Sequence, residues 1–180
     1  MDKINSIIAE KGIVYLISQI ISAVATLFLL FSFQRKNHRS ILLMQAVSGM
    51  LFGIQYMMIG APSGAICNFV GMARSFTYSF RTRSKIVDHI ACPIFFSIAF
   101  ACCGIFTVNS LFSILPICAM IISSFVTWNP KTQQLRALTL PTSVMWLIYN
   151  ASCGSLVAVI TELSSEVSII IGLIRFRKRK

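Results

Sequence analysis

Residues 13–33 read IVYLISQIISAVATLFLLFSF, and the polar stretch QRKNHR follows directly at 34–39. The first stretch has no charged residue and is close to the roughly 20 residues that an α-helix needs to cross a bilayer. Arg35, Lys36 and Arg39 then follow it within six residues. No small-residue cleavage site precedes a polar domain, so we interpret the run as a retained membrane helix and not as a signal peptide.

The composition of the whole chain supports the same interpretation. Of 180 residues, 56% are hydrophobic and 12% are charged, which leaves too little polar surface for a water-soluble globule. The net charge of +11 would otherwise suggest nucleic acid, but the basic residues stand at the ends of apolar runs and not on a polar face. We therefore expect the lipid bilayer as a partner and no nucleic acid.

Seven apolar segments approach the length of a membrane span. They run over 13–33, 41–59, 64–80, 86–103, 106–127, 137–152 and 155–174. The break between the fourth and fifth segments rests on Gly104 and Asn109 alone. With seven spans, thirteen of the 16 Lys and Arg residues fall on one face, and only Lys3 and Lys11 fall on the other. The positive-inside rule then predicts a multi-pass protein of the bacterial inner membrane with its N-terminus outside and its C-terminus in the cytoplasm.

An internal repeat emerges when the chain is aligned with itself at an offset of 94 residues. The second and third segments then align with the sixth and seventh without a gap, and Gly60 falls on Gly154. We call residues 94 apart matched positions. The expected fold is an all-α membrane domain over 1–180 with seven transmembrane helices in a 3+1+3 order. Its parts are a first three-helix repeat (12–85), a linker helix (86–104), a second, parallel repeat (105–175) and a basic tail (176–180).

Three charged residues fall deep inside the predicted spans. Counted at 1.5 Å per residue, Arg74, Glu162 and Glu166 lie about 15, 10 and 16 Å from the outer surface. An ionised group there costs about 2.5–3.5 kcal/mol, so such residues are functional candidates. Arg74 and Glu166 are expected either to form a structural ion pair or to take part in proton coupling. Arg74 follows Asn68 by six residues, about 120° around the helix, so the two are not expected to face one path.

Parallel repeats are a transporter architecture in which the binding site lies between the repeats near the midplane. Asn68 and Glu162 hold matched positions and are predicted on opposite walls of such a site. The full set of predicted substrate-binding residues is Asn68, Glu162, Glu166, Trp146, Asn150 and Gln55. Aromatic residues near helix ends could equally be interfacial anchors. Gly49 and Gly53 form a GxxxG motif, which predicts close helix packing.

Three motifs carry a family resemblance. RSFTYSFRTRS at 74–84, WLIYNASCGS at 146–155 and IIGLIRFRKRK at 170–180 resemble the YgjV-type bacterial inner membrane proteins over nearly the whole chain. The 3+1+3 organisation is similar to that of the SWEET, PQ-loop and PnuC transporters, whose third and seventh helices line the substrate site. The resemblance implies that Asn68 and Glu162 line the corresponding site in this chain. The chain has no Pro-Gln dipeptide, and Pro116 is matched by Ser22, so the resemblance implies no proline hinge common to both halves.

Enzyme chemistry is not predicted. Asp88 and His89 are adjacent, but the chain has no HExxH motif and no third ligand beside them, so we expect no metal and no cofactor. The leading hypothesis is a transporter or facilitator of a small polar solute, such as a nucleoside, vitamin or sugar-like molecule, that works by alternating access. The alternative is a non-transporting subunit or receptor whose buried charges only hold helices together. The sequence leaves open whether the chain forms a homo-oligomer.

Overall fold

The computed structural model describes residues 2–108 and 110–176, and these residues form helices and connections without any strand. The α-helices are α1 (Asp2–Phe33), α2 (His38–Met58), α3 (Pro62–Tyr78), α4 (Lys85–Asp88), α5 (Ala91–Thr107), α6 (Ile114–Trp128), α7 (Thr132–Ser152) and α8 (Leu156–Arg175). Two 3-10 helices, η1 (Arg81–Arg83) and η2 (Leu111–Ser113), lie in the connections. The prediction of an all-α protein is therefore confirmed.

Four helical stretches are long and apolar enough to cross a membrane. They are Gly12–Phe33, His38–Met58, Leu111–Trp128 and Leu156–Arg175. The other three predicted spans overlap α3, α5 and α7, of which α3 and α5 have 17 residues each. The helix α7 has 21 residues but is less apolar, because several of its polar side chains face the interior cavity described below.

The predicted fourth span differs from the structure at both ends. The segment expected at 86–103 is divided into the short helix α4 and the longer α5, which continues through Gly104 to Thr107. Gly104 is thus helical and not a turn residue, and Asn109 lies outside the described residues. Pro93 is tolerated near the start of α5 because the first turn of a helix has no intrahelical acceptor for its N–H groups.

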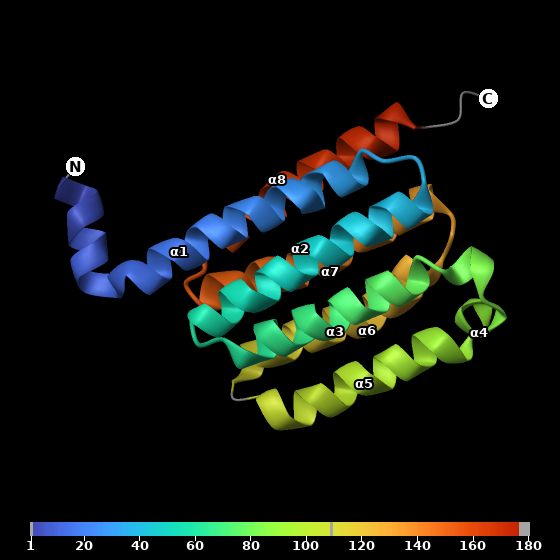
Figure 1. Ribbon diagram of the computed structural model, residues 1–180, viewed down its shortest axis with the longest axis horizontal. Coiled ribbons are helices and arrows are strands. Elements are labelled where there is room, and N and C mark those ends of the chain that lie inside the picture. The colour runs from blue at the N-terminus through green and yellow to red at the C-terminus, as the bar shows by residue number, and fades with distance from the viewer. Residues whose placement is uncertain (1, 109, 177–180) are drawn as a thin grey trace.

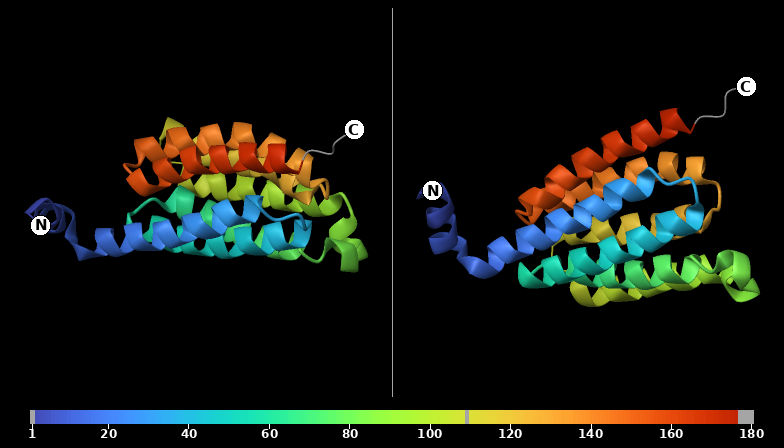
Figure 2. Two further views of the ribbon diagram at one scale, coloured as in Figure 1. Left: turned by 90° about the horizontal axis from the view of Figure 1, so that it is seen from above. Right: turned by 45° about the horizontal axis from the view of Figure 1, so that its top comes forward.

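The helices form two layers (Figures 1 and 2). One layer contains α1, α2 and α3, and the other contains α8, α7 and α6 behind them. Between the layers, α1 contacts α8 and α3 contacts α6, while α5 packs at the edge against α3 and α6. An exchange of α1, α2 and α3 with α6, α7 and α8 leaves the contacts among these six helices unchanged, whereas α5 packs on one side only.

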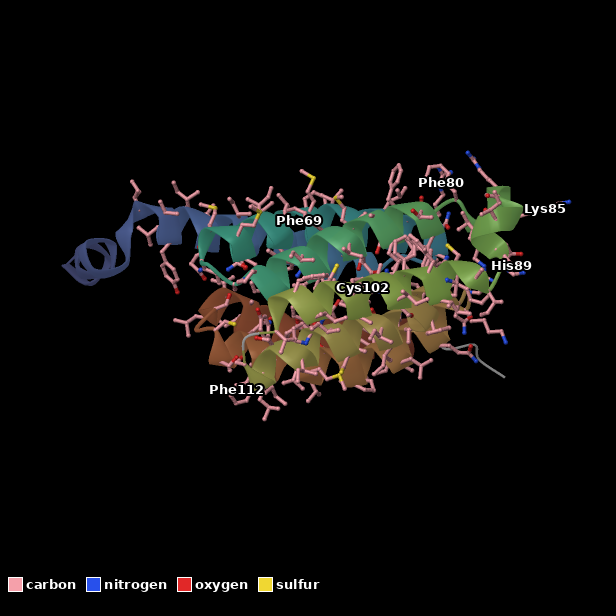
Figure 3. All side chains as sticks on the ribbon, turned by 90° about the horizontal axis from the view of Figure 1, so that it is seen from below. Phe69, Phe80, Lys85, His89, Cys102 and Phe112 are labelled. Atoms are coloured by element: carbon pink, nitrogen blue, oxygen red, sulfur yellow. The ribbon has the colours of Figure 1, made fainter. Side chains whose placement is uncertain are left out.

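The two ends of the bundle differ in composition. At one end lie the connections 34–37, 79–90 and 129–131 and the end of α8; we call it the basic end, because it holds nine of the ten Lys and Arg residues at positions 12–176. At the other end lie the turns at Gly60 and Gly154; we call it the glycine-turn end. In Figure 3, Lys85 and His89 mark the basic end and Phe112 the opposite one.

Helix ends and turns recur at the offset of 94 residues. Both bounds of α7 lie 94 residues after those of α2, and α8 begins 94 residues after α3. Gly60 and Gly154 have φ values of 71° and 66°, a left-handed conformation that glycine adopts without strain. The backbone N–H after each glycine donates to the carbonyl five residues earlier, at 2.9 and 3.1 Å, as in a Schellman motif. The two turns are therefore built alike.

The packing role predicted for the GxxxG motif is confirmed. A Cβ atom added to Gly49 would lie 3.2 Å from the carbonyl oxygen of Asn68, on the neighbouring helix. One added to Gly53 would lie 2.7 Å from the ring of Phe69. The absence of side chains at both positions thus lets α2 approach α3 closely.

Candidate functional site

A cavity of about 150 Å³ lies between the two layers. Side chains from α1, α2, α3, α6, α7 and α8 line it. Its lining extends from Tyr56, near the glycine-turn end, to Phe33 and Thr127 at the basic end. The cavity therefore reaches along more than half of the bundle.

Matched positions make up most of the lining. Of 21 lining residues, 16 form eight pairs 94 residues apart. These pairs are Leu29/Ser123, Phe33/Thr127, Gln45/Thr139, Ser48/Thr142, Gly49/Ser143, Phe52/Trp146, Asn68/Glu162 and Gly71/Ser165. Such a lining is expected where a cavity surrounds the axis that relates the two layers.

Asn68 and Glu162, the predicted matched pair, both line the cavity. The Glu162 Oε2 atom accepts a hydrogen bond of 2.5 Å from the Ser143 hydroxyl. Ser165 donates to the backbone carbonyl of Glu162 at 2.9 Å. The Asn68 amide nitrogen donates to the carbonyl of Gly64 at 2.9 Å. The structure thus places both side chains at one cavity, and their role in binding stays a prediction.

Arg74 also lines the cavity, so the expectation that it faces away from the path of Asn68 is wrong. The reason is that the lining runs obliquely along α3 and includes residues from Asn68 to Ser75. The side chain is only 4% exposed, and its Nη1 atom donates to the Met120 carbonyl at 3.0 Å and to the Ser123 hydroxyl at 2.7 Å. Arg74 thereby connects α3 with α6.

The predicted ion pair between Arg74 and Glu166 is not formed. Among the side chains that the structure describes, at 12–106, 108 and 110–176, one ion pair is formed, between Arg81 and Asp88 at 2.7 Å. Arg74 projects from α3 towards α6, whereas α8, which holds Glu166, packs against α7 and α1. Equal depth in the bilayer therefore did not bring the two charges together. Glu166 is absent from the cavity lining, and its Oε1 atom is buried without a described partner.

Gln55 and Asn150 occupy a different place from the one expected of cavity residues. With Tyr56, Tyr149 and Ser155 they form what we call the interhalf polar cluster, near the glycine-turn end. The Tyr56 hydroxyl donates to the Asn150 carbonyl oxygen, Gln55 donates to the Ser155 hydroxyl at 3.2 Å, and the Gly64 N–H donates to the Tyr149 hydroxyl at 3.1 Å. Each bond joins the two layers.

The interhalf polar cluster also closes the cavity at this end. The centre of the Tyr56 ring lies 6.1 Å from the ring centre of Trp146 and 6.2 Å from that of Tyr149. Aromatic side chains thus fill the space around the hydrogen bonds. Tyr56 and Asn150 are themselves matched positions, and two such residues can touch only close to the axis that relates the layers. Trp146, by contrast, contributes to the cavity lining as well.

Two features of the interior were missed by sequence reasoning. Arg136 is one of the thirteen basic residues that the sequence assigns to the connections on one face. In the structure it is 0% exposed within α7 and donates to the carbonyls of Phe33 and Arg35, at 3.0 and 2.6 Å. It therefore satisfies carbonyl groups at the end of α1, which have no intrahelical donor. Ser143 was also missed, because a serine in an apolar helix gives no signal until its neighbours in space are known.

The outer surface of the bundle is apolar, in contrast to the cavity. Ile13, Phe31 and Ile160 are 65%, 57% and 61% exposed, and many other large apolar side chains are exposed along the helices. An apolar exterior on long helices, with polar groups turned inward, defines an integral membrane protein.

The particular family follows from the sequence as a whole. The chain belongs to the Imp-YgjV family of bacterial inner membrane proteins, whose model matches residues 16–180. No curated protein and no solved structure matches the chain.

Proposed function

We propose that the protein is a transporter or facilitator of a small polar solute, which it binds in the interior cavity and releases by alternating access. The observation that carries the proposal is the cavity lining, in which matched positions, many of them with polar side chains, surround a space inside an apolar bundle. Polar groups are costly in a membrane interior and are typical of substrate and ion pathways. Binding sites between repeats are the common arrangement in transporters built this way.

We further infer that seven helices cross the membrane as two parallel triplets, α1–α3 and α6–α8, with α5 as the linker. The matched helix bounds, the matched turns and the symmetric helix contacts support this 3+1+3 order, which SWEET, PQ-loop and PnuC proteins also have. The basic end is the cytoplasmic one by the positive-inside rule. The C-terminus is then cytoplasmic and the N-terminus outside.

Alternating access requires the cavity to open at each end in turn. At the glycine-turn end, the bonds of the interhalf polar cluster join the two triplets and must break for a solute to leave. Each bond joins groups of different triplets, so a rocking motion of one triplet against the other would separate them together. Transport could be downhill or coupled to protons through Glu162.

Thiol labelling tests this proposal without knowledge of the solute. In a variant that lacks the six native cysteines, Ser165→Cys places a thiol on the cavity wall, and Val167→Cys places one on the exposed apolar face of the same helix. Each would be treated in proteoliposomes with a membrane-impermeant cationic thiol reagent. A water-filled cavity predicts modification of Ser165→Cys at least about tenfold faster than that of Val167→Cys, because only a hydrated thiol ionises readily. Equal, slow rates would indicate a dry interior and favour the non-transporting alternative.

A further inference from the structure

The charges around the cavity are few and unpaired. Among its lining residues, Arg74 is the one cation and Glu162 the one acid. They belong to different layers, and no hydrogen bond or ion pair joins them in the part of the chain that the structure describes. Each of these groups therefore lacks a counter-charge. A buried charge without an ionic partner is costly in a membrane protein.

The Arg74 guanidinium has donors to spare. Its Nη1 atom makes all the described hydrogen bonds, and one face of the group lies 5.3 Å from the centre of the Phe100 ring. Its Nη2 atom donates in no described hydrogen bond. Nε has no acceptor and is fully buried, so a bound acid reaches it only when the side chain turns. Nε and Nη2 share one edge of the guanidinium, and a carboxylate can accept from such an edge through both oxygens.

The Glu162 carboxylate likewise has no cationic partner among the described residues. Ser143 donates to Oε2, and the donors described around the carboxylate, Ser143 and Ser165, are both neutral hydroxyl groups. A carboxylate accepts only, so the missing partner is a donor, and the strongest donor for it is a cation. The nearby Asn68 has its amide nitrogen bound to Gly64, which leaves its carbonyl oxygen for a second contact with the same ligand.

We propose that the solute is a small zwitterion, with an acidic group for Arg74 and an ammonium group for Glu162; this assignment rests on the proposed transport function. A zwitterion satisfies both charges at once, whereas a neutral solute leaves two unpaired and a singly charged solute leaves one. The cavity volume of about 150 Å³ matches one that holds benzene, so the solute has roughly six to ten non-hydrogen atoms.

The positions of the two charges also bear on the length of the solute. Glu162 is matched to Asn68, and Arg74 follows Asn68 by six residues on a helix that runs in the same direction. Counted from the matched first residues of α3 and α8, the two charged residues originate about 9 Å apart along the bundle, and not the roughly 5 Å that the depths expected from the sequence give. This spacing favours a zwitterion whose charges are separated by several bonds, such as an ω-amino acid.

The experiment compares ligands of equal size and different charge. Trp128→Phe leaves Trp146, on the cavity wall, as the only tryptophan, and keeps an aromatic ring beside Arg81. The fluorescence of the purified full-length variant would be titrated with 4-aminobutyrate, 4-hydroxybutyrate, 4-aminobutyramide and 4-hydroxybutyramide. These four compounds are a zwitterion, an anion, a cation and a neutral molecule. A second set would consist of alanine, lactate, alaninamide and lactamide.

The proposal predicts that the zwitterion of at least one set binds at least about tenfold tighter than each of its three analogues. Binding of a neutral or singly charged member as tight as that of the zwitterion overturns it. So does a failure of both zwitterions to bind when Ser165→Cys is labelled rapidly, a result that leaves the transport function standing. Slow labelling of Ser165→Cys overturns the transport function itself.

Variants separate recognition from a structural role. Arg74→Gln should remove the preference for acid over amide and keep the preference for amine over alcohol, and Glu162→Gln should do the reverse. A merely structural role would lower the affinity for all four compounds together. If Arg74→Gln does not fold, Arg74→Lys retains the charge without the two-donor edge, and it should weaken acid recognition by about tenfold without abolishing it.

Discussion

The two layers of the bundle differ around Asn68 and Glu162, the matched pair of polar residues in the cavity. In the second layer, Ser143 and Ser165 surround Glu162 with hydroxyl groups, whereas the first layer has Gly49 and Gly71 at the matched positions. The backbones correspond in part: α2 and α7 have matched bounds, α3 and α8 begin at matched residues, and the two glycine turns are built alike. The difference teaches that the repeated backbone forms the space, while side chains of one layer alone provide for a carboxylate there.

The first layer uses its glycines for another purpose. Gly49 lets α2 approach the backbone of Asn68, and a Cβ atom added to Gly71 would lie 2.4 Å from the end of the Met120 side chain. Side chains at these positions would push helices apart or fill the cavity. At these matched positions, glycine in the first layer allows close packing, and serine in the second layer forms hydrogen bonds.

The largest effect is expected when the second layer is given the residue of the first. Glu162→Asn removes the only acid of the cavity lining and should lower the initial rate of uptake of the tightest-binding zwitterion by about 10- to 150-fold, the equivalent of a charged hydrogen bond. Uptake into proteoliposomes measures this, with Glu166→Asn as the matched control, because it removes an acid of the same helix that is absent from the cavity lining. Undiminished uptake by Glu162→Asn would remove the carboxylate from the mechanism.

A smaller effect is expected for the packing difference between the layers. Gly53→Leu introduces the residue of its matched position, Leu147, against the ring of Phe69, and should lower the free energy of unfolding by about 1–3 kcal/mol. Adding Phe69→Leu copies Leu163, the residue matched to Phe69, and should restore most of the loss. Reversible denaturation in detergent measures both, and a double variant no more stable than Gly53→Leu would contradict the correspondence of the layers.

The smallest effect concerns what the layers share. Gly60→Ala and Gly154→Ala each force a non-glycine residue to a positive φ, at a cost of about 1–2 kcal/mol. An added Cβ has no atom within 4 Å at either position, so the cost comes from the backbone alone. The two variants should therefore lose equal stability within a few tenths of a kcal/mol in the same denaturation measurement. A clear inequality would show that the turns are not equivalent.

Much of the fold could be predicted because it depends on local properties. Apolar runs, basic connections and glycines located most helices and turns to within about five residues. The exceptions are the division at α4 and α5 and the start of the fifth span, which was expected at 106 whereas α6 begins at Ile114. Asn68 and Glu162 could be paired in advance, since an offset between repeats is visible in the sequence. The orientation of Arg74 could not be predicted. Six residues at an ideal 100° each give its angle around the helix axis, but the cavity runs obliquely along α3 and reaches both Asn68 and Arg74.

The sequence by itself determined a helical membrane protein with two similar halves, a basic end and buried charges. These properties follow from hydropathy, from loop charge and from the backbone freedom of glycine at Gly60 and Gly154. Only the tertiary structure decided that Arg74 bonds to α6 and not to Glu166, and that Gln55 and Asn150 join the layers instead of lining the cavity. Helices that are apolar on most faces do not specify their own rotation, so the neighbours of a buried polar group depend on packing between distant segments.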